Sequence, residues 1–324
     1  MATSCQPCAS AWPSCAAIGA DVNDADDALR ILDAHFTGEE IHTDGIWLRV
    51  RMERLDPAQR SGWKLHLSAT PDAYAGLLCA AAPVLAAAGV PFKALRDADE
   101  LERMNAGERG LMQVGKAVTI YPRTEEESVA MAESLRAALR GMTGPVVPTD
   151  FAYCNDAPIY FRFGPYDGRM EIDAMAQERR LVWRPDLGRD VWDLTSGGPA
   201  EGPTPKLLPH RAPPVHLAFL RVRYRLLRML QLSAKGGVFI GVEEGAAQPV
   251  PLLIKTARPG TNSDRHGRDA VWALRGEHAL LETLRGVPGL PEAGTLIDSP
   301  QASAIVRPFV HGETFWDVWT SPGA

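Results

Sequence analysis

The chain has 324 residues, 45% of them hydrophobic and 23% charged, a composition typical of a globular protein long enough for two domains. Its net charge is −6, so binding to nucleic acid or to an anionic membrane would need a local basic patch. No run of about eighteen apolar residues is present, and the N-terminus lacks the basic flank and apolar stretch of a signal peptide. These features predict a cytoplasmic protein with neither nucleic-acid nor membrane partners.

Residues 1–24 are predicted to be a disordered leader rich in Ala and Ser. Cys5 and Cys8 form a CxxC pair and Cys15 follows, but no second pair or nearby histidine completes a tetrahedral set. Zinc binding is therefore only an alternative for this segment. The five cysteines of the chain are too few and too scattered for a disulfide framework.

Residues 25–168 alternate strand-like and helix-like segments. Thr70 and Pro71 precede an alanine-rich run that stops at Gly89, which predicts a helix over 71–88. Thr124 and Glu127 form a capping-box pattern that predicts a second helix over 125–140. Alternating or β-branched segments predict strands over 62–70, 115–122 and 157–164.

Residues 169–214 have a different composition. They contain seven prolines and a Gly-Gly pair, a density that disfavours helix interiors and central strands. This segment is predicted to be an irregular linker. Alternation of elements resumes over 215–324.

The segment GWKLHLSAT carries the most informative polar residues. In a strand, the period of two places Lys64 and His66 on one face and the apolar residues Trp63, Leu65 and Leu67 on the other. Lys64 and His66 thus point the same way. The alternative is that they form the solvated face of an edge strand.

Three further basic residues lie within apolar segments, namely Lys93, Lys116 and Arg162. Burying an uncompensated charge costs several kcal/mol, so several such residues are best explained by a shared anion. A phosphate suits both ammonium and guanidinium groups. Separate ion pairs with Asp97, Glu100 or Asp150 are the alternative.

With these residues in view, the sequence resembles a known family. GWKLHLSATP, APVLAAAGVPFKALRD, GKAVTIYP, GPVVPTDFAY and PIYFRFG resemble, in this order and spacing, the phosphoserine/phosphothreonine lyase domain of class III and class IV lanthipeptide synthetases. The resemblance covers residues 45–168. It implies a fold related to the phosphothreonine lyases of bacterial effectors and elimination of phosphate from a phosphorylated precursor peptide, which gives dehydroalanine or dehydrobutyrine.

The resemblance also implies residue roles. Lys93, in the PFK motif, would be the general base and His66, in the KxH motif, the general acid, while Lys64, Lys116 and Arg162 would hold the phosphate. No metal or cofactor is expected, because the cations themselves can stabilise the developing charge. The segment NAGERGLMQV departs from the family pattern, so Asn105 and Arg109 are secondary candidates only.

The C-terminal block follows the order of a protein kinase N-lobe. A strand, a turn at Gly236 and Gly237, a second strand, a strand ending in Lys255 and a helix carrying Glu277 occur in sequence. IKTARP resembles the kinase of the same synthetases. The glycine pair is equally compatible with an ordinary hairpin turn.

No HRDxxxxN-type catalytic loop or DFG-type Asp occurs, so the kinase-like part is predicted to be incomplete, with a vestigial ATP site formed by Gly236, Gly237, Lys255 and Glu277. ATP and Mg²⁺ are expected only if a kinase C-lobe is supplied. The main prediction is an α+β protein with an effector-type lyase fold over 25–168, a linker over 169–214 and a partial kinase N-lobe over 215–324.

Its expected partners are a phosphorylated precursor peptide and, in addition, a separate kinase and cyclase or a missing C-terminal part. Two alternatives remain for the function. The chain could be the first part of a full lyase-kinase-cyclase synthetase, or a non-catalytic protein that binds a leader peptide or a partner.

Overall fold

The computed structural model describes residues 27–193, 202–209, 217–300, 302–312 and 319. The predicted leader, with Cys5, Cys8 and Cys15, lies outside these residues. Contacts divide the chain into two compact units, which are Met1–Pro214 with Ser263–Gly267, and Val215–Asn262 with Arg268–Ala324. The first unit therefore extends beyond residue 168, where the first domain was expected to end.

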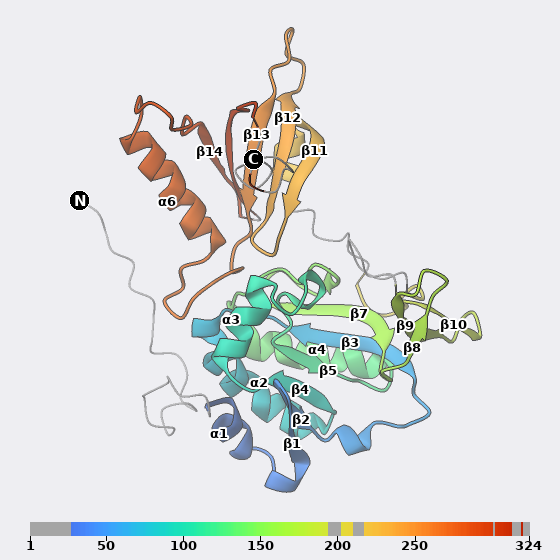
Figure 1. Cartoon of the computed structure of the whole chain (residues 1–324). Helices are drawn as coiled ribbons and strands as arrows, with labels where there is room; N and C mark the ends of the chain where they lie inside the picture. Colours follow the sequence, from blue (N-terminus) through green and yellow to red (C-terminus); the bar gives the residue numbers. More distant parts are fainter. Residues whose placement is uncertain (1–26, 194–201, 210–216, 301, 313–318, 320–324) are drawn as a thin grey trace. The chain divides into compact units, whose positions relative to one another are not determined.

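The first unit is built on a seven-stranded sheet in the order β1-β2-β4-β5-β3-β7-β6, in which neighbouring strands are antiparallel (Figure 1). The strands are β1 (Ile41–Asp44), β2 (Trp47–Val50), β3 (Ser61–Leu67), β4 (Phe92–Leu95), β5 (Val118–Ile120), β6 (Phe151–Ala152) and β7 (Ile159–Pro165). The helices are α1 (Asp27–Asp33), α2 (Tyr74–Ala88), α3 (Ala98–Ala106) and α4 (Glu125–Leu139), with 3-10 turns η1 (Gly38–Glu40), η2 (Met52–Arg54), η3 (Pro71–Ala73) and η4 (Leu111–Gln113).

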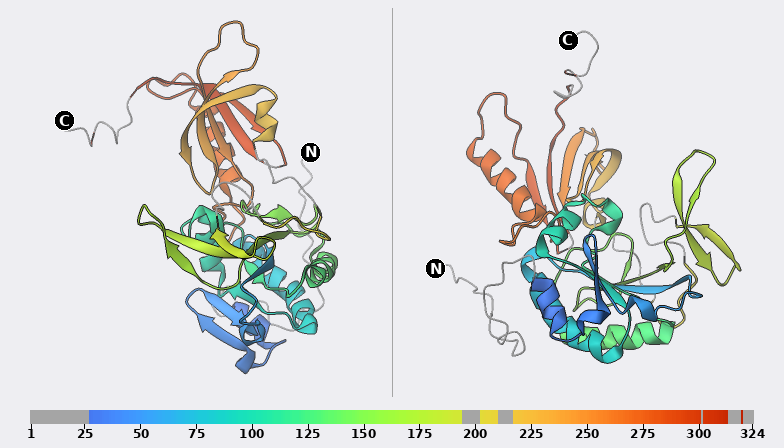
Figure 2. Two further views of the ribbon diagram at one scale, coloured as in Figure 1. Left: turned by 90° about the vertical axis from the view of Figure 1, so that its right-hand side faces the viewer. Right: turned by 60° about the horizontal axis from the view of Figure 1, so that its bottom comes forward.

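Helices α2 and α4 cover one face of this sheet (Figure 2). The alternation of β3 turns Leu65 and Leu67, both 0% exposed, into the core of this layer. Trp63 packs there against Phe161 and Phe163 of β7, with ring centroids 5.9 and 5.5 Å apart. The opposite face of β3 is left for Lys64 and His66.

The ends of α2 and α4 follow the predicted signals with two differences. Residues 71–73 form a 3-10 turn, so α2 begins at Tyr74. It ends at Ala88 and is capped by Gly89, whose φ of 68° suits glycine. At α4 the Thr124 hydroxyl accepts the N–H of Glu127 at 3.2 Å, but the Glu127 carboxylate accepts from the N–H of Arg123. A full capping box would need the Glu127 carboxylate to accept from the N–H of Thr124, the next residue along the chain.

Within the described residues, the segment Pro71–Ala88 is long and apolar enough to cross a membrane by length and composition. The expectation that no such segment exists is therefore wrong. The many alanines keep the mean hydropathy of the segment high although it contains a few polar residues. Leu77, Leu78 and Leu85 of this segment are at most 1% exposed and belong to the core of the first unit. This burial pattern is that of a core helix.

A three-stranded antiparallel sheet, in the order β10-β9-β8, corrects the prediction of an irregular linker for residues 170–192 (Figure 1). Its strands are β8 (Met170–Ile172), β9 (Glu178–Arg184) and β10 (Arg189–Trp192). Of the prolines that suggested a linker, Pro185 lies in the turn after β9 and the others follow residue 193. The alternation within ERRLVWR was therefore the better local signal, and Val182 joins the core of the first unit.

The second unit has a five-stranded antiparallel sheet in the order β11-β12-β13-β15-β14. Its strands are β11 (Tyr224–Leu232), β12 (Gly237–Glu243), β13 (Leu252–Ala257), β14 (Thr295–Asp298) and β15 (Ser303–Pro308), and its helices are α5 (Ala218–Arg221) and α6 (Ala270–Thr283). Helix α6 packs against β13 and β15 through Ala270, Val271 and Leu274. Because helices accompany antiparallel sheets in both units, the coarse α+β prediction is confirmed.

Candidate active site

A cavity of about 380 Å³ lies in the first unit, and all five residues predicted for the lyase site line it. Lys64 and His66 come from β3, Lys93 from β4 and Arg162 from β7, while Lys116 immediately precedes β5. Among its lining residues are six lysine and arginine side chains, the imidazole of His66 and one carboxylate, that of Asp193. The cavity is therefore a cationic, largely polar space suited to an anion.

The sheet register places Lys93 and His66 in one row across the sheet. Lys93 of β4 is opposite Thr119 of β5, which is opposite His66 of β3, which is opposite Tyr160 of β7. Directly opposed residues share a face and have Cα atoms about 5 Å apart, so the Cα atoms of Lys93 and His66 lie roughly 10 Å apart, on either side of Thr119. Lys64 and Arg162 form the adjacent cross-strand pair.

His66 is held by a buried carboxylate. Its Nδ1 lies 2.5 Å from Oδ2 of Asp150, and both side chains are almost completely buried. Burial lowers the pKa of His66 to about 4, against the attraction of Asp150, so the imidazole is neutral near pH 7. In this state Nδ1 carries the proton and donates a hydrogen bond to Asp150, so Nε2 is unprotonated.

Asp150 has further partners. Its Oδ1 accepts a hydrogen bond from the Thr149 hydroxyl at 2.7 Å and lies 3.9 Å from Nζ of Lys116. Burial raises the pKa of Asp150, but the charges of His66 and Lys116 outweigh burial and hold this pKa well below its usual range. Asp150 is thus an anion beneath the cavity that partly compensates its cations.

The three lysines of the cavity lose proton affinity through burial. Burial, with Arg49 as the next cause, lowers the pKa of Lys93 to about 8, and burial lowers that of Lys116 to about 8. Burial and then Arg162 lower the pKa of Lys64 well below its ordinary value. Burial therefore makes a neutral amine at Lys93 more accessible near neutral pH than in an ordinary lysine, which favours a role as general base.

Aromatic rings contact two of these lysines. Nζ of Lys93 lies 3.8 Å from the ring centroid of Trp47, and Nζ of Lys64 lies 5.2 Å from that of Tyr121. Such contacts favour the ammonium form and restrict the amine to one side of the cavity. Trp47 and Tyr121 both line the cavity.

Arg162 is in the cavity but is already paired. Its Nη2 lies 2.7 Å from Oδ2 of Asp193, and both side chains are buried. Sequence reasoning missed Asp193 and Arg180, because both belong to the segment that was expected to be irregular. It named Asp150 only as one possible ion-pair partner. The alternation of β9 was the available signal for Arg180.

The two secondary candidates have different positions. Arg109 lines the cavity and donates to Glu100 at 2.7 Å. Asn105 is fully buried, donates to the carbonyl of Ala69 at 2.9 Å and accepts the N–H of Gly115 at 3.0 Å. Asn105 therefore holds the loop that presents Lys116.

The ion pairs suggested as an alternative form only in part. Asp150 does contact His66 and Lys116. Asp97 pairs with Arg96, however, and Glu100 pairs with arginines rather than with the cavity lysines.

The second unit brings its four predicted residues to one cavity of about 230 Å³, lined by Gly236, Gly237, Lys255 and Glu277 among others. Nζ of Lys255 forms an ion pair with Oε2 of Glu277. Gly236 has φ of 155°, and a Cβ there would lie 2.1 Å from the carbonyl oxygen of Thr256. Only glycine fits this turn.

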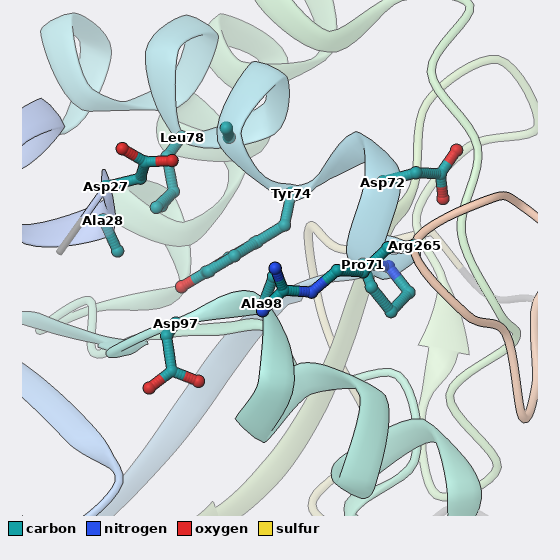
Figure 3. A pocket seen from close by; sticks show the side chains of 10 residues that line it. Asp27, Ala28, Pro71, Asp72, Tyr74, Leu78, Asp97, Ala98 and Arg265 are labelled. Carbon is teal, nitrogen blue, oxygen red and sulfur yellow. The ribbon is translucent and has the colours of Figure 1, made fainter. Parts of the chain in front are cut away.

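A further cavity of about 170 Å³ in the first unit has a different character (Figure 3). Tyr74 extends across it, with Asp97 near its hydroxyl end, whereas the carboxylate of Asp72 points away from the ring (Figure 3). The Tyr74 hydroxyl donates to the carbonyl of Leu95 at 2.5 Å. This pocket lacks the lysine cluster of the larger cavity.

Comparisons with known proteins place this fold and site in context. The model of a family described as "RamC, N-terminal domain" matches residues 30–197, more than half of the chain. A "Probable SapB synthase" of Streptomyces coelicolor is 31% identical over 262 residues, covering 79% of this chain and 27% of the relative. The chain thus spans about a quarter of that relative's length.

These matches support the coarser part of the sequence prediction, a lanthipeptide synthetase-like protein. The matched residues 30–197 include the whole seven-stranded sheet and the cavity with Lys64, His66 and Lys93. The chain belongs to the RamC N-terminal domain family.

Proposed function

We propose that the first unit is a carbon-oxygen lyase that eliminates phosphate from phosphoserine or phosphothreonine of a precursor peptide in lanthipeptide biosynthesis. The observation that carries this proposal is the row of Lys93, Thr119 and His66 in a cavity lined by further cations. A lysine with lowered pKa and a histidine two strands away, with both side chains lining one cavity, can act on opposite ends of a Cα–Cβ–O unit.

The proposed reaction needs a base and an acid. The neutral Nζ of Lys93 removes the α-proton, and the electron pair of the Cα–H bond forms the Cα=Cβ double bond. The Cβ–O bond breaks, the phosphate leaves with that electron pair, and Nε2–H of His66 protonates the bridging oxygen. The products are dehydroalanine, or dehydrobutyrine from phosphothreonine, and inorganic phosphate.

Lys64, Lys116 and Arg162 are proposed to bind the phosphate, and Arg180 joins them because it lines the same cavity. Their charges stabilise the phosphate as it leaves, so the reaction needs no metal ion. A bound dianion also raises the pKa of nearby cations. The dianion would thus favour a protonated His66, which is otherwise neutral near pH 7, as the acid. The same effect acts on Lys93, where burial opposes it and keeps the amine available as a base.

Asp150 is proposed to position His66 rather than to touch the substrate. Its bond to Nδ1 fixes the ring so that Nε2 carries the transferable proton once the imidazole is charged. The carboxylate also stabilises that imidazolium. With this arrangement, His66 can be neutral without a bound anion and become protonated when the phosphate binds.

For the second unit we propose a protein-kinase-like N-lobe. The Lys255–Glu277 ion pair beside the Gly236 turn supports this interpretation. ATP and Mg²⁺ would bind there only together with a C-lobe. The proposed partners are the phosphorylated precursor peptide, a kinase and a cyclase, and the proposed location is the cytoplasm.

The proposal is tested with a synthetic phosphoserine peptide, the full chain and mass spectrometry. We expect the peptide to lose phosphoric acid without ATP and in the presence of EDTA. Lys93→Ala should abolish the reaction while circular dichroism shows an unchanged fold, and Arg123→Ala, on the surface, is the control.

Three results would contradict the proposed chemistry. Release of phosphate that leaves intact serine would mean hydrolysis, and inhibition by EDTA would require a metal. Phosphopeptide binding without any elimination would favour the non-catalytic binding protein.

A further inference from the structure

The three-stranded sheet carries apolar side chains directly beside the cationic cavity. Arg180 of β9 lies opposite Met170 of β8, and on its other side the N–H of Asp193 donates to the Arg180 carbonyl at 2.8 Å. Opposed residues of an antiparallel sheet share a face. Asp193, Arg180 and Met170 therefore form one row, of which the first two line the cavity.

One end of this face is buried and the other is open. Val182, two residues beyond Arg180, is 4% exposed and part of the core of the first unit. Met170, beside Arg180 on the neighbouring strand, is 47% exposed, and Ile172, on the same face of β8 and on the side away from Val182, is 61% exposed. We call Arg180, Met170 and Ile172 the ribbon face.

We infer that the ribbon face binds the part of the substrate peptide that flanks the phosphorylated residue. The substrates would then be phosphopeptides with an apolar side chain close to the phosphoserine or phosphothreonine. This inference rests on the proposed function, because it places the phosphate next to Arg180. We choose the substrate peptide as the ligand of this face because the row runs without a break from the cavity, where the phosphate would bind, to Met170.

The spacing of the row indicates which peptide residue would make the contact. Adjacent strands are about 4.8 Å apart, and an arginine side chain extends several ångströms towards the phosphate. Met170 would thus lie roughly 10 Å from the phosphate, a distance spanned by about three extended residues. Because β8 is an edge strand of its sheet, an extended peptide can also pair with its backbone.

The test uses two peptides in which an unreactive phosphonate replaces phosphoserine. They carry either leucine or serine two to four residues on both sides of the phosphonate. Binding to the full chain is measured by fluorescence anisotropy for the wild type and for the double variant Met170→Ser with Ile172→Ser. Leu187→Ser is the matched control, since Leu187 is 50% exposed in the turn between β9 and β10.

We expect the wild type and the Leu187→Ser control to bind the leucine peptide about tenfold more tightly than the serine peptide. The double variant should bind both peptides alike, at the affinity of the wild type for the serine peptide. Retention of this serine-peptide affinity would show that the phosphonate site is intact.

The inference would be overturned if the wild type bound both peptides equally, or if the double variant weakened both by the same factor. An altered oligomeric state of the double variant with an unchanged preference for leucine would also overturn it, because the face would then contact another copy. The phosphonate cannot be eliminated. A chain that prefers the leucine peptide but does not act on phosphoserine would therefore contradict the proposed function alone.

Discussion

Binding of a dianion to the cavity should be coupled to proton uptake by the protein. The pKa of His66 is about 4, so at pH 7 its imidazole holds almost no extra proton and can accept nearly one. Lys93 and Lys116, each with a pKa of about 8, are roughly 90% protonated and can together accept only about 0.2 protons. Among these three groups His66 is therefore expected to take up the most.

Inorganic sulfate is the appropriate probe, because its charge of −2 does not change in this pH range. Calorimetric titration at pH 7 in buffers of different ionisation enthalpy measures the number of protons taken up. We expect more than about 0.2 protons for the wild type and a clear decrease in His66→Gln, whereas His42→Gln, an exposed histidine of β1, should match the wild type.

Uptake of 0.2 protons or less in the wild type would refute protonation of His66 on anion binding. Equal uptake in the wild type and in His66→Gln would be equally damaging, since it would show that the anion does not charge this imidazole. Either result would remove the physical basis for His66 as the general acid.

Three further predictions concern stability and the second unit. Asp150→Asn should lower the free energy of unfolding by roughly 1 to 3 kcal/mol, because the amide can still accept from His66 but no longer compensates Lys116; a urea titration showing less than about 0.5 kcal/mol would contradict this. The folded pKa of His66, about 4, lies below its ordinary 6.5, so the unfolded chain binds the proton more strongly and stability should fall as the pH drops from about 6.5 towards 4. Urea midpoints at several pH values test this decrease, and His66→Gln should flatten it. Lys255→Met should leave lyase activity within about a factor of two, because Lys255 belongs to the other compact unit and contacts Glu277 there; loss of activity in a folded variant would show that the units share a site.

Local patterns predicted much of the fold. The helix signals at Thr70, Gly89 and Thr124 placed α2 and α4 to within a few residues, because caps and glycine stops act on neighbouring backbone groups. Composition gave the wrong prediction for residues 170–192. The prolines further along the chain suggested an irregular linker, although the alternation of β9 indicated a strand. Membrane-span potential was also misjudged, since Pro71–Ala88 is sufficiently apolar but is used in the core.

The candidate site divides in the same way. Lys64 and His66 were expected to share a face, and they do, because the period of a strand is a property of the backbone alone. That Lys93, Lys116 and Arg162 line the same cavity was an expectation from charge and resemblance, and only the strand order β4-β5-β3-β7 brings them together. Neighbours in this order are separated by long stretches of chain.

What the sequence determined by itself, then, is the identity of the buried cations and the face on which Lys64 and His66 lie. Tertiary structure alone decided their partners. Asp150 reaches His66 across 84 residues and Asp193 reaches Arg162 across 31, so no local period could reveal either contact. Since the pKa of a buried group depends on these long-range neighbours and on its loss of solvent, the protonation of the site is a property of the folded chain.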